Sequence, residues 1–163
     1  MEAVLFLIHP NDLETLILEA ETSQNVLESE FMQQSLYLGT AWETLNQALN
    51  PAGQPAQEGM EFAIQAEHPL SERLSHPDAV RYNTVVRVAE LQQALQRLTV
   101  DEVKKRYQFA VVNTAPEALA QELRLAELKL IYLQLQDFYR EAARKNWAVL
   151  SVIQDKIRPE KLI

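Results

Sequence analysis

The chain has 163 residues, with 23 acidic and 15 basic side chains and a formal net charge of −8. This length suits one domain with its own core, and we expect one domain over residues 1–163 with 155–163 as a tail. The absence of cysteine excludes disulfides, thiol catalysis and cysteine-ligated metal sites, and the three glycines form no glycine-rich phosphate loop.

The first predicted element is a strand over Glu2–His9, where the sequence EAVLFLIH is apolar without clean alternation. Such a run is typical of a strand that is covered on both faces. Pro10-Asn11-Asp12 then indicates the start of a helix, and the polar residues 22–36 predict a short helix within loops.

The longest apolar run, Ala3 to Ile8, is only six residues long. A membrane-spanning helix needs ~20 apolar residues and a signal-peptide core needs at least ~7. We therefore expect neither membrane insertion nor secretion, and the lack of cysteine is compatible with a cytoplasmic location.

Three segments carry the pattern Thr-x-x-Glu, namely Thr40–Glu43, Thr99–Glu102 and Thr114–Glu117. Each fits a capping box, in which the threonine oxygen and the glutamate carboxylate accept hydrogen bonds from amides at a helix start. Each segment therefore predicts a helix boundary.

The middle of the chain predicts a loop and two strands. Residues 51–59 (PAGQPAQEG) hold two glycines and two prolines and indicate a loop. Met60–Ala66 alternates between apolar and polar residues, which predicts a half-buried strand. Arg81–Val86 predicts a short strand that leads into a helix over Val88–Leu98.

The C-terminal third predicts a long helix over residues 115–145, followed by a strand over Trp147–Ile153. Two apolar stripes at helical spacing make a broad apolar face, so we expect this helix to pass through the centre of the domain. The same spacing leaves open a coiled-coil homodimer, although core packing is the favoured interpretation.

Motifs that would carry chemistry are absent from this sequence. It has no nucleotide-binding, hydrolase or metalloprotease motif, and the spacing of His9, His68 and His76 does not indicate a metal site. We expect no catalytic residue, no metal site and no cofactor.

The distribution of charge is uneven along the chain. Residues 1–78 hold 13 acidic side chains and one basic side chain, Arg73, whereas residues 79–163 hold 10 acidic and 14 basic side chains. One interpretation is that the two halves fold over each other and mix their charges. The other is that the acidic half attracts a basic protein partner. The acidic balance argues against a nucleic-acid partner.

From residue 38 onward the order of features resembles the YfbM-like family of uncharacterised bacterial proteins. The resemblance is carried by Trp42 and Leu45 in GTAWETLNQALN (39–50), by Pro69-Leu70, Arg81-Tyr82 and Arg106-Tyr107, and most closely by DFYREAARKNWAVLSVI (137–153). Gly39-Thr40 and Asn46 stand where the family usually has Asp-Lys and His. The resemblance implies an α+β fold. We predict a small mixed sheet packed against several helices, including one long central helix near the C-terminus. The resemblance implies no established activity.

Two functions follow from these observations. The favoured one is a non-catalytic interaction domain, immunity-like or inhibitor-like, that presents an acidic surface to a basic protein. The alternative is a pocket for a planar or anionic small ligand, enzymatic in one version, built from Trp42, Arg81 and Tyr82. A monomer and a homodimer through the long helix both remain open.

Overall fold

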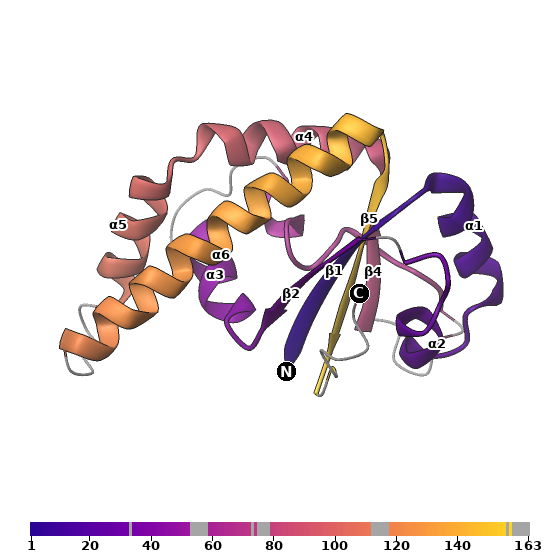
Figure 1. Ribbon diagram of the computed structural model, residues 1–163, viewed down its shortest axis with the longest axis horizontal. Helices are drawn as coiled ribbons and strands as arrows, with labels where there is room; N and C mark the ends of the chain where they lie inside the picture. The colour runs from indigo at the N-terminus through magenta and orange to yellow at the C-terminus, as the bar shows by residue number, and fades with distance from the viewer. Residues whose placement is uncertain are drawn as a thin grey trace.

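A five-stranded sheet lies between two layers of helices (Figure 1). The computed structural model describes residues 1–32, 34–52, 59–72, 74, 79–111, 118–155 and 157. The elements in chain order are β1 (Glu2–Ile8), α1 (Pro10–Glu19), α2 (Ser23–Leu27), β2 (Gln34–Gly39), α3 (Trp42–Leu49), η1 (Met60–Phe62), β3 (His68–Pro69), β4 (Val80–Asn83), α4 (Val85–Arg97), α5 (Val100–Val111), α6 (Ala118–Lys145) and β5 (Ala148–Gln154). The predicted α+β class is confirmed.

The strands are ordered β2-β1-β5-β4-β3, so the first and last long strands pair at the middle of the sheet. Phe6 of β1 lies opposite Leu150 of β5 in this central pair. All the described strand pairs are antiparallel, so the predicted mixed sheet is corrected to an antiparallel one.

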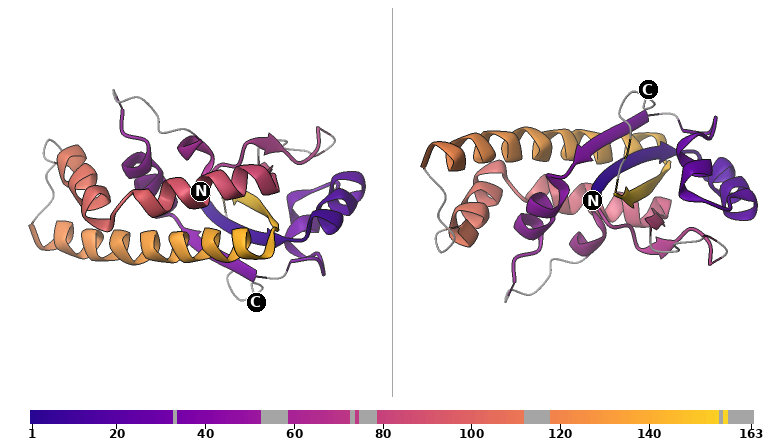
Figure 2. Two further views of the ribbon diagram at one scale, coloured as in Figure 1. Left: turned by 90° about the horizontal axis from the view of Figure 1, so that it is seen from above. Right: turned by 90° about the horizontal axis from the view of Figure 1, so that it is seen from below.

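Both faces of the sheet are covered, because α1 and α2 lie on one side and α3 to α6 on the other (Figures 1 and 2). Leu5 and Leu7 pack into the core under α3–α6, whereas Phe6 and Ile8 pack into the core under α1 and α2. Successive residues of β1 thus point alternately into the two cores. This explains why its sequence is apolar without alternation.

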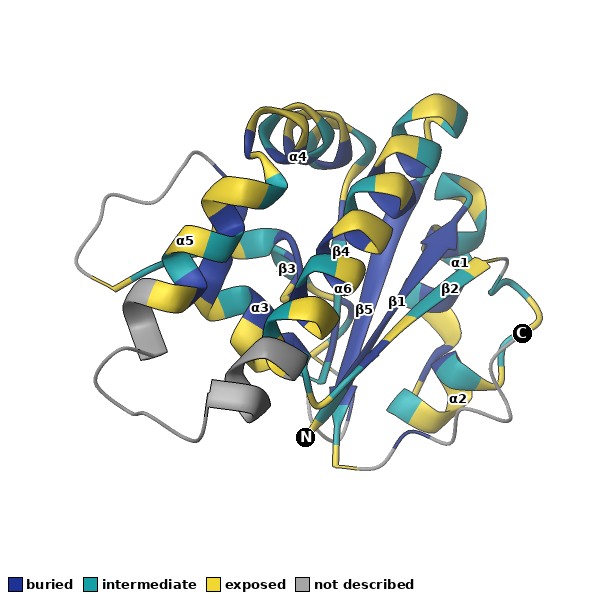
Figure 3. Cartoon of the chain, turned by 60° about the vertical axis from the view of Figure 1, so that its left-hand side comes forward, coloured by how far each residue is buried: buried dark blue, intermediate teal, exposed yellow. Residues whose placement is uncertain are grey.

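Helix α6 buries one stripe and exposes the other (Figure 3). Leu128, Tyr132 and Leu135 are buried against the sheet side, whereas Leu130 and Leu133 are 58% and 45% exposed. The helix therefore lies along one face of the sheet and does not pass through the centre of the domain. It begins at Ala118, and residues 112–117, where the prediction began it, lie outside the described part.

The strand predicted for Met60–Ala66 is wrong. Gly59 has a φ of +82° and is followed by the short 3₁₀ helix η1. Met60, Ala63 and Ile64 are all fully buried at helical spacing. The alternation seen in the sequence therefore reflects a tight turn that buries three residues. Residues 53–58 of the predicted loop lie outside the described part.

The capping boxes had different outcomes. The box at Thr40 is wrong, because α3 begins one residue later, with Ala41 as its N-cap and no side-chain cap. The Thr99 oxygen does accept a hydrogen bond from the Glu102 amide, at 3.2 Å. The box at Thr114–Glu117 lies outside the described residues.

Two further boundaries differ from the prediction. The edge strand β2 lies at the end of the segment that was predicted as a short helix within loops, where apolar residues are sparse. Strand β4 ends at Asn83, because Thr84 caps α4 by accepting a hydrogen bond from the Arg87 amide. None of the helices in the described ranges is both long enough and apolar enough to cross a bilayer.

Candidate functional site

The three predicted ligand residues occupy separate positions in the fold. Trp42 starts α3, is 7% exposed, and donates a hydrogen bond from Nε1 to the Met1 carbonyl oxygen at 3.1 Å. Arg81 and Tyr82 are neighbours on β4, so their side chains leave the sheet on opposite faces. The ring of Tyr82 lies 5.2 Å from that of His68 and packs against the core under α1 and α2.

Trp42, Arg81 and Tyr82 are therefore not brought to one site. Trp42 belongs to the core under α3–α6, on the other side of the sheet from the Tyr82 ring. The guanidinium of Arg81 donates to the carbonyl oxygens of Ala66 and Glu67, at 2.5 and 2.7 Å. It ties the segment after η1 to β4, which is a structural role.

His9 also has a structural position. Its Nδ1 accepts a hydrogen bond from the Asn11 amide at 3.1 Å and caps α1, and its ring lies edge-on to Trp147 with centroids 5.7 Å apart. A side chain at the N-cap satisfies an amide that the helix leaves unpaired. No group of three or more His, Asp and Glu side chains in the described ranges lies close enough to hold a metal ion.

Acidic side chains gather in the helical layer formed by α1 and α2. We call residues 10–30 the acidic layer: they contain six carboxylates and neither lysine nor arginine. The carboxylates are those of Asp12, Glu14, Glu19, Glu21, Glu28 and Glu30, and all but Asp12 are on exposed residues. Leu18, which is 70% exposed, lies among them on α1.

Five of the six carboxylates of the acidic layer form no ion pair with the basic half of the chain within the described residues. Asp12, Glu14, Glu19, Glu21 and Glu30 form no ion pair with any lysine or arginine that the structure describes. The basic side chains of α4 and α6 instead pair largely with acids of their own helices.

One described ion pair joins the two halves of the chain. Arg87 on α4 holds Glu67 at 2.6 Å and also pairs with Glu90 at 2.7 Å. The carboxylates of the front half are thus divided, because Glu43 and Glu67 lie with the other layer. Charge mixing between the halves is limited to that layer in the described part.

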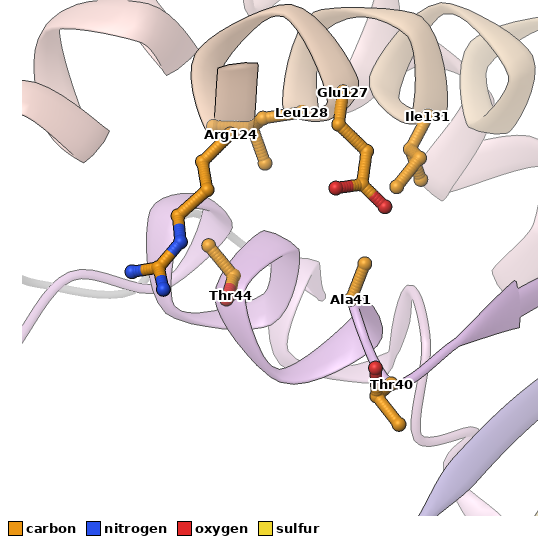
Figure 4. Close-up of a pocket in the computed structure, with 7 residues that line it drawn as sticks. All are labelled: Thr40, Ala41, Thr44, Arg124, Glu127, Leu128 and Ile131. Atoms are coloured by element: carbon orange, nitrogen blue, oxygen red, sulfur yellow. The ribbon is translucent and has the colours of Figure 1, made fainter. Parts of the chain in front are cut away.

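A small hollow of about 180 Å³ lies between the start of α3 and the N-terminal half of α6. Seven residues line it: Thr40, Ala41, Thr44, Arg124, Glu127, Leu128 and Ile131. Figure 4 shows the Arg124 and Glu127 side chains reaching from α6 toward α3, the guanidinium beside Thr44 and the carboxylate above Ala41. Two opposite charges, two hydroxyls and an apolar wall therefore meet in one hollow.

Arg124 was not among the predicted site residues, although the sequence carries a signal for it. Leu128, Ile131, Leu135 and Phe138 follow one another at alternating spacings of three and four along α6, and all are buried. Continuing the spacing backward places Arg124 at the next position of this stripe, where the residue is exposed. A charged residue in an apolar stripe marks a position where the buried core ends or where the charged side chain lies near another polar group.

The comparisons with known proteins agree with the fold. The family model described as "Domain of unknown function (DUF1877)" matches residues 1–152. A crystal structure of the Escherichia coli protein YfbM, described as a protein of unknown function, superposes with a TM-score of 0.72 at 18% identity, covering 94% of this chain and 100% of that chain. At that identity the likeness shows the fold alone. No curated protein matches the chain.

Proposed function

The chain belongs to the DUF1877 family, and for this member we propose a non-catalytic binding domain whose acidic layer receives a basic protein. The observation that carries the proposal is the set of six carboxylates between residues 10 and 30 with no lysine or arginine among them. Complementary potential accelerates the encounter with an oppositely charged partner and rejects like-charged competitors.

The composition of the surface supports a protein as the partner. Leu18 offers an exposed apolar side chain in the middle of the acidic layer, and Ile17 beside it is half-buried. Protein interfaces commonly have an apolar centre and a polar rim. A partner that fits this surface has lysines or arginines around an apolar recess.

The test compares two triple variants that remove the same charge from opposite sides of the sheet. Glu14→Gln/Glu19→Gln/Glu21→Gln neutralises the acidic layer, whereas Glu43→Gln/Asp101→Asn/Glu102→Gln neutralises exposed acids on α3 and α5. Each tagged protein is used to capture partners from an extract of the native cells, and the captured protein is then purified and titrated against all three.

We expect the wild-type chain and the α3/α5 variant to capture the same lysine- and arginine-rich protein, and the acidic-layer variant to lose it. The association rate should fall by about tenfold in the acidic-layer variant and decrease as salt rises, since exposed charges are screened beyond ~8 Å at physiological ionic strength. Equal capture by both variants would refute the acidic layer as the binding surface. A captured protein that is not basic would refute the proposed class of partner.

A further inference from the structure

We propose that the hollow between α3 and α6 binds a small zwitterion of the α-amino-acid class. Arg124 and Thr44 hold its carboxylate, and Glu127 holds its ammonium group. The site is separate from the acidic layer, because the sheet lies between them (Figure 1).

The first observation is the position of Arg124 on α6. It occupies the same helical stripe as Leu128 and Ile131, which are 3% and 9% exposed and form the apolar wall of the hollow. An apolar residue at position 124 would extend that stripe over α3. The chain instead places a guanidinium there, directly beside the Thr44 hydroxyl (Figure 4).

The second observation is that Arg124 and Glu127 leave each other unpaired. Opposite charges three residues apart pair readily on a helix. Arg87 and Glu90 do so at 2.7 Å, and Asp137 and Arg140 do so at 2.6 Å. Arg124 and Glu127 have the same spacing but form no ion pair with one another or with any other described residue.

The polar groups have the arrangement that a zwitterion requires. A guanidinium donates two parallel hydrogen bonds to a carboxylate, and a carboxylate accepts hydrogen bonds from an ammonium group. The two groups come from adjacent turns of α6 and stand over opposite parts of α3, with Thr44 near the guanidinium and Ala41 below the carboxylate (Figure 4). The ligand's carboxylate and ammonium are separated by one carbon, which then lies over Ala41.

The size and charge of the hollow narrow the ligand class. Its volume of about 180 Å³ is below the range of ~300–1,000 Å³ that drug-sized ligands and cofactors occupy. A simple anion would be repelled by Glu127, and a simple amine would be repelled by Arg124. Leu128 and Ile131, which line the hollow, would contact a short aliphatic side chain of the ligand.

The experiment titrates the full chain with three probes of similar size: L-alanine, propionate and ethylamine. Binding is measured by calorimetry and by the amide shifts of Ala41 and Thr44. We expect saturable binding of L-alanine, and binding of propionate and ethylamine weaker by at least about tenfold, since each lacks one charge-assisted contact. Arg124→Gln and Glu127→Gln should each weaken L-alanine binding by about tenfold.

The matched controls lie on the exposed face of the same helix. Arg140→Gln and Asp137→Asn alter another i, i+3 pair of opposite charges away from the hollow and should leave L-alanine binding unchanged. All four side chains are on exposed residues, so the fold should be retained, which circular dichroism verifies. Propionate that binds as tightly as L-alanine, ethylamine that does so, insensitivity to either hollow variant, or no saturation by any probe would overturn the proposal.

Discussion

Asn83 of β4 and Tyr139 of α6 meet across a fully buried hydrogen bond of 3.3 Å, in which the Asn83 amide donates to the Tyr139 hydroxyl. Both side chains also hold the segment that follows Gly59. Asn83 donates to the Phe62 carbonyl oxygen at 2.8 Å and accepts from the Glu67 amide at 2.9 Å, and Tyr139 donates to the Ala63 carbonyl oxygen at 2.6 Å. The long helix, the sheet and the η1 turn are therefore joined by two side chains.

Removing the Tyr139 hydroxyl should destabilise the fold. Tyr139→Phe leaves the Ala63 carbonyl oxygen without its donor in a buried place, and an unsatisfied buried group costs about 1–3 kcal/mol of unfolding free energy. Tyr82→Phe is the control, because the described contact of the Tyr82 ring is with His68, and its effect should stay within about 0.5 kcal/mol. Urea unfolding measures both, and equal effects would contradict the role of the network.

The two buried tyrosines should make stability fall at alkaline pH. Burial raises the pKa of Tyr132 from 10.0 to about 12 and also raises the pKa of Tyr139. Above pH ~10 the unfolded chain releases these protons whereas the folded chain keeps them, so the contribution of the two tyrosines to the unfolding free energy is constant below pH ~10 and falls above it. Urea midpoints across this range test it. Tyr132→Phe should show a shallower fall, and an unchanged slope would contradict the assignment.

The sequence predicted the elements whose pattern is set locally. The apolar runs of β1 and β5 predict strands correctly because both faces of these strands are buried. The periodicity of α6 predicts a helix correctly because one stripe of the helix is buried. The Met60–Ala66 segment could not be predicted in the same way, because three buried residues at a turn give the same pattern of apolar and polar residues as a half-buried strand. The η1 turn depends on Asn83 and Tyr139, which are distant in sequence.

The candidate sites were harder to predict, because each depends on which face of the sheet a residue reaches. Arg81 and Tyr82 are adjacent in sequence, but strand geometry separates them, and Trp42 lies across the sheet from the Tyr82 ring. The hollow joins residues 40–44 with residues 124–131, and only the packing of α3 against α6 brings them together. The charge imbalance was visible in the sequence, but the division of the front-half carboxylates between the two helical layers was not.

Gly59 and Gly39 should respond differently to alanine. Gly59 has a φ of +82°, and a Cβ there would lie 2.7 Å from Nη1 of Arg87, whose guanidinium is held by Glu67 and Glu90. Gly39 has a φ of +57°, but its Cβ would be in ordinary contact at 3.5 Å. We expect Gly39→Ala to cost about 1 kcal/mol through the backbone alone and Gly59→Ala about 2 kcal/mol or more. Thermal unfolding compares the stability of the two variants. Equal losses would mean that the Arg87 side chain moves away from the added Cβ at no cost.

Arg124→Leu should stabilise the chain and remove zwitterion binding together. A leucine at this position continues the apolar stripe of Leu128 and Ile131 toward Thr44 and should add about 1 kcal/mol of unfolding free energy. Arg140→Leu, on the exposed face of α6, should add nothing because no apolar surface is buried there. Paired urea unfolding and L-alanine titrations measure both effects. A loss of stability in Arg124→Leu would show that Arg124 has a structural role.

Leu18→Ala separates the apolar contribution of the acidic layer from its charges. The Leu18 side chain is 70% exposed, so its truncation should change the unfolding free energy by less than about 0.5 kcal/mol. An apolar anchor at the centre of an interface should instead weaken binding of the captured basic protein by about tenfold, through faster dissociation. Leu130→Ala, 58% exposed on α6, is the control and should leave binding unchanged. Because removing an uncharged side chain leaves the electrostatic attraction intact, the association rate and its salt dependence should stay as in the wild-type chain. Unchanged dissociation in Leu18→Ala would restrict recognition to the carboxylates.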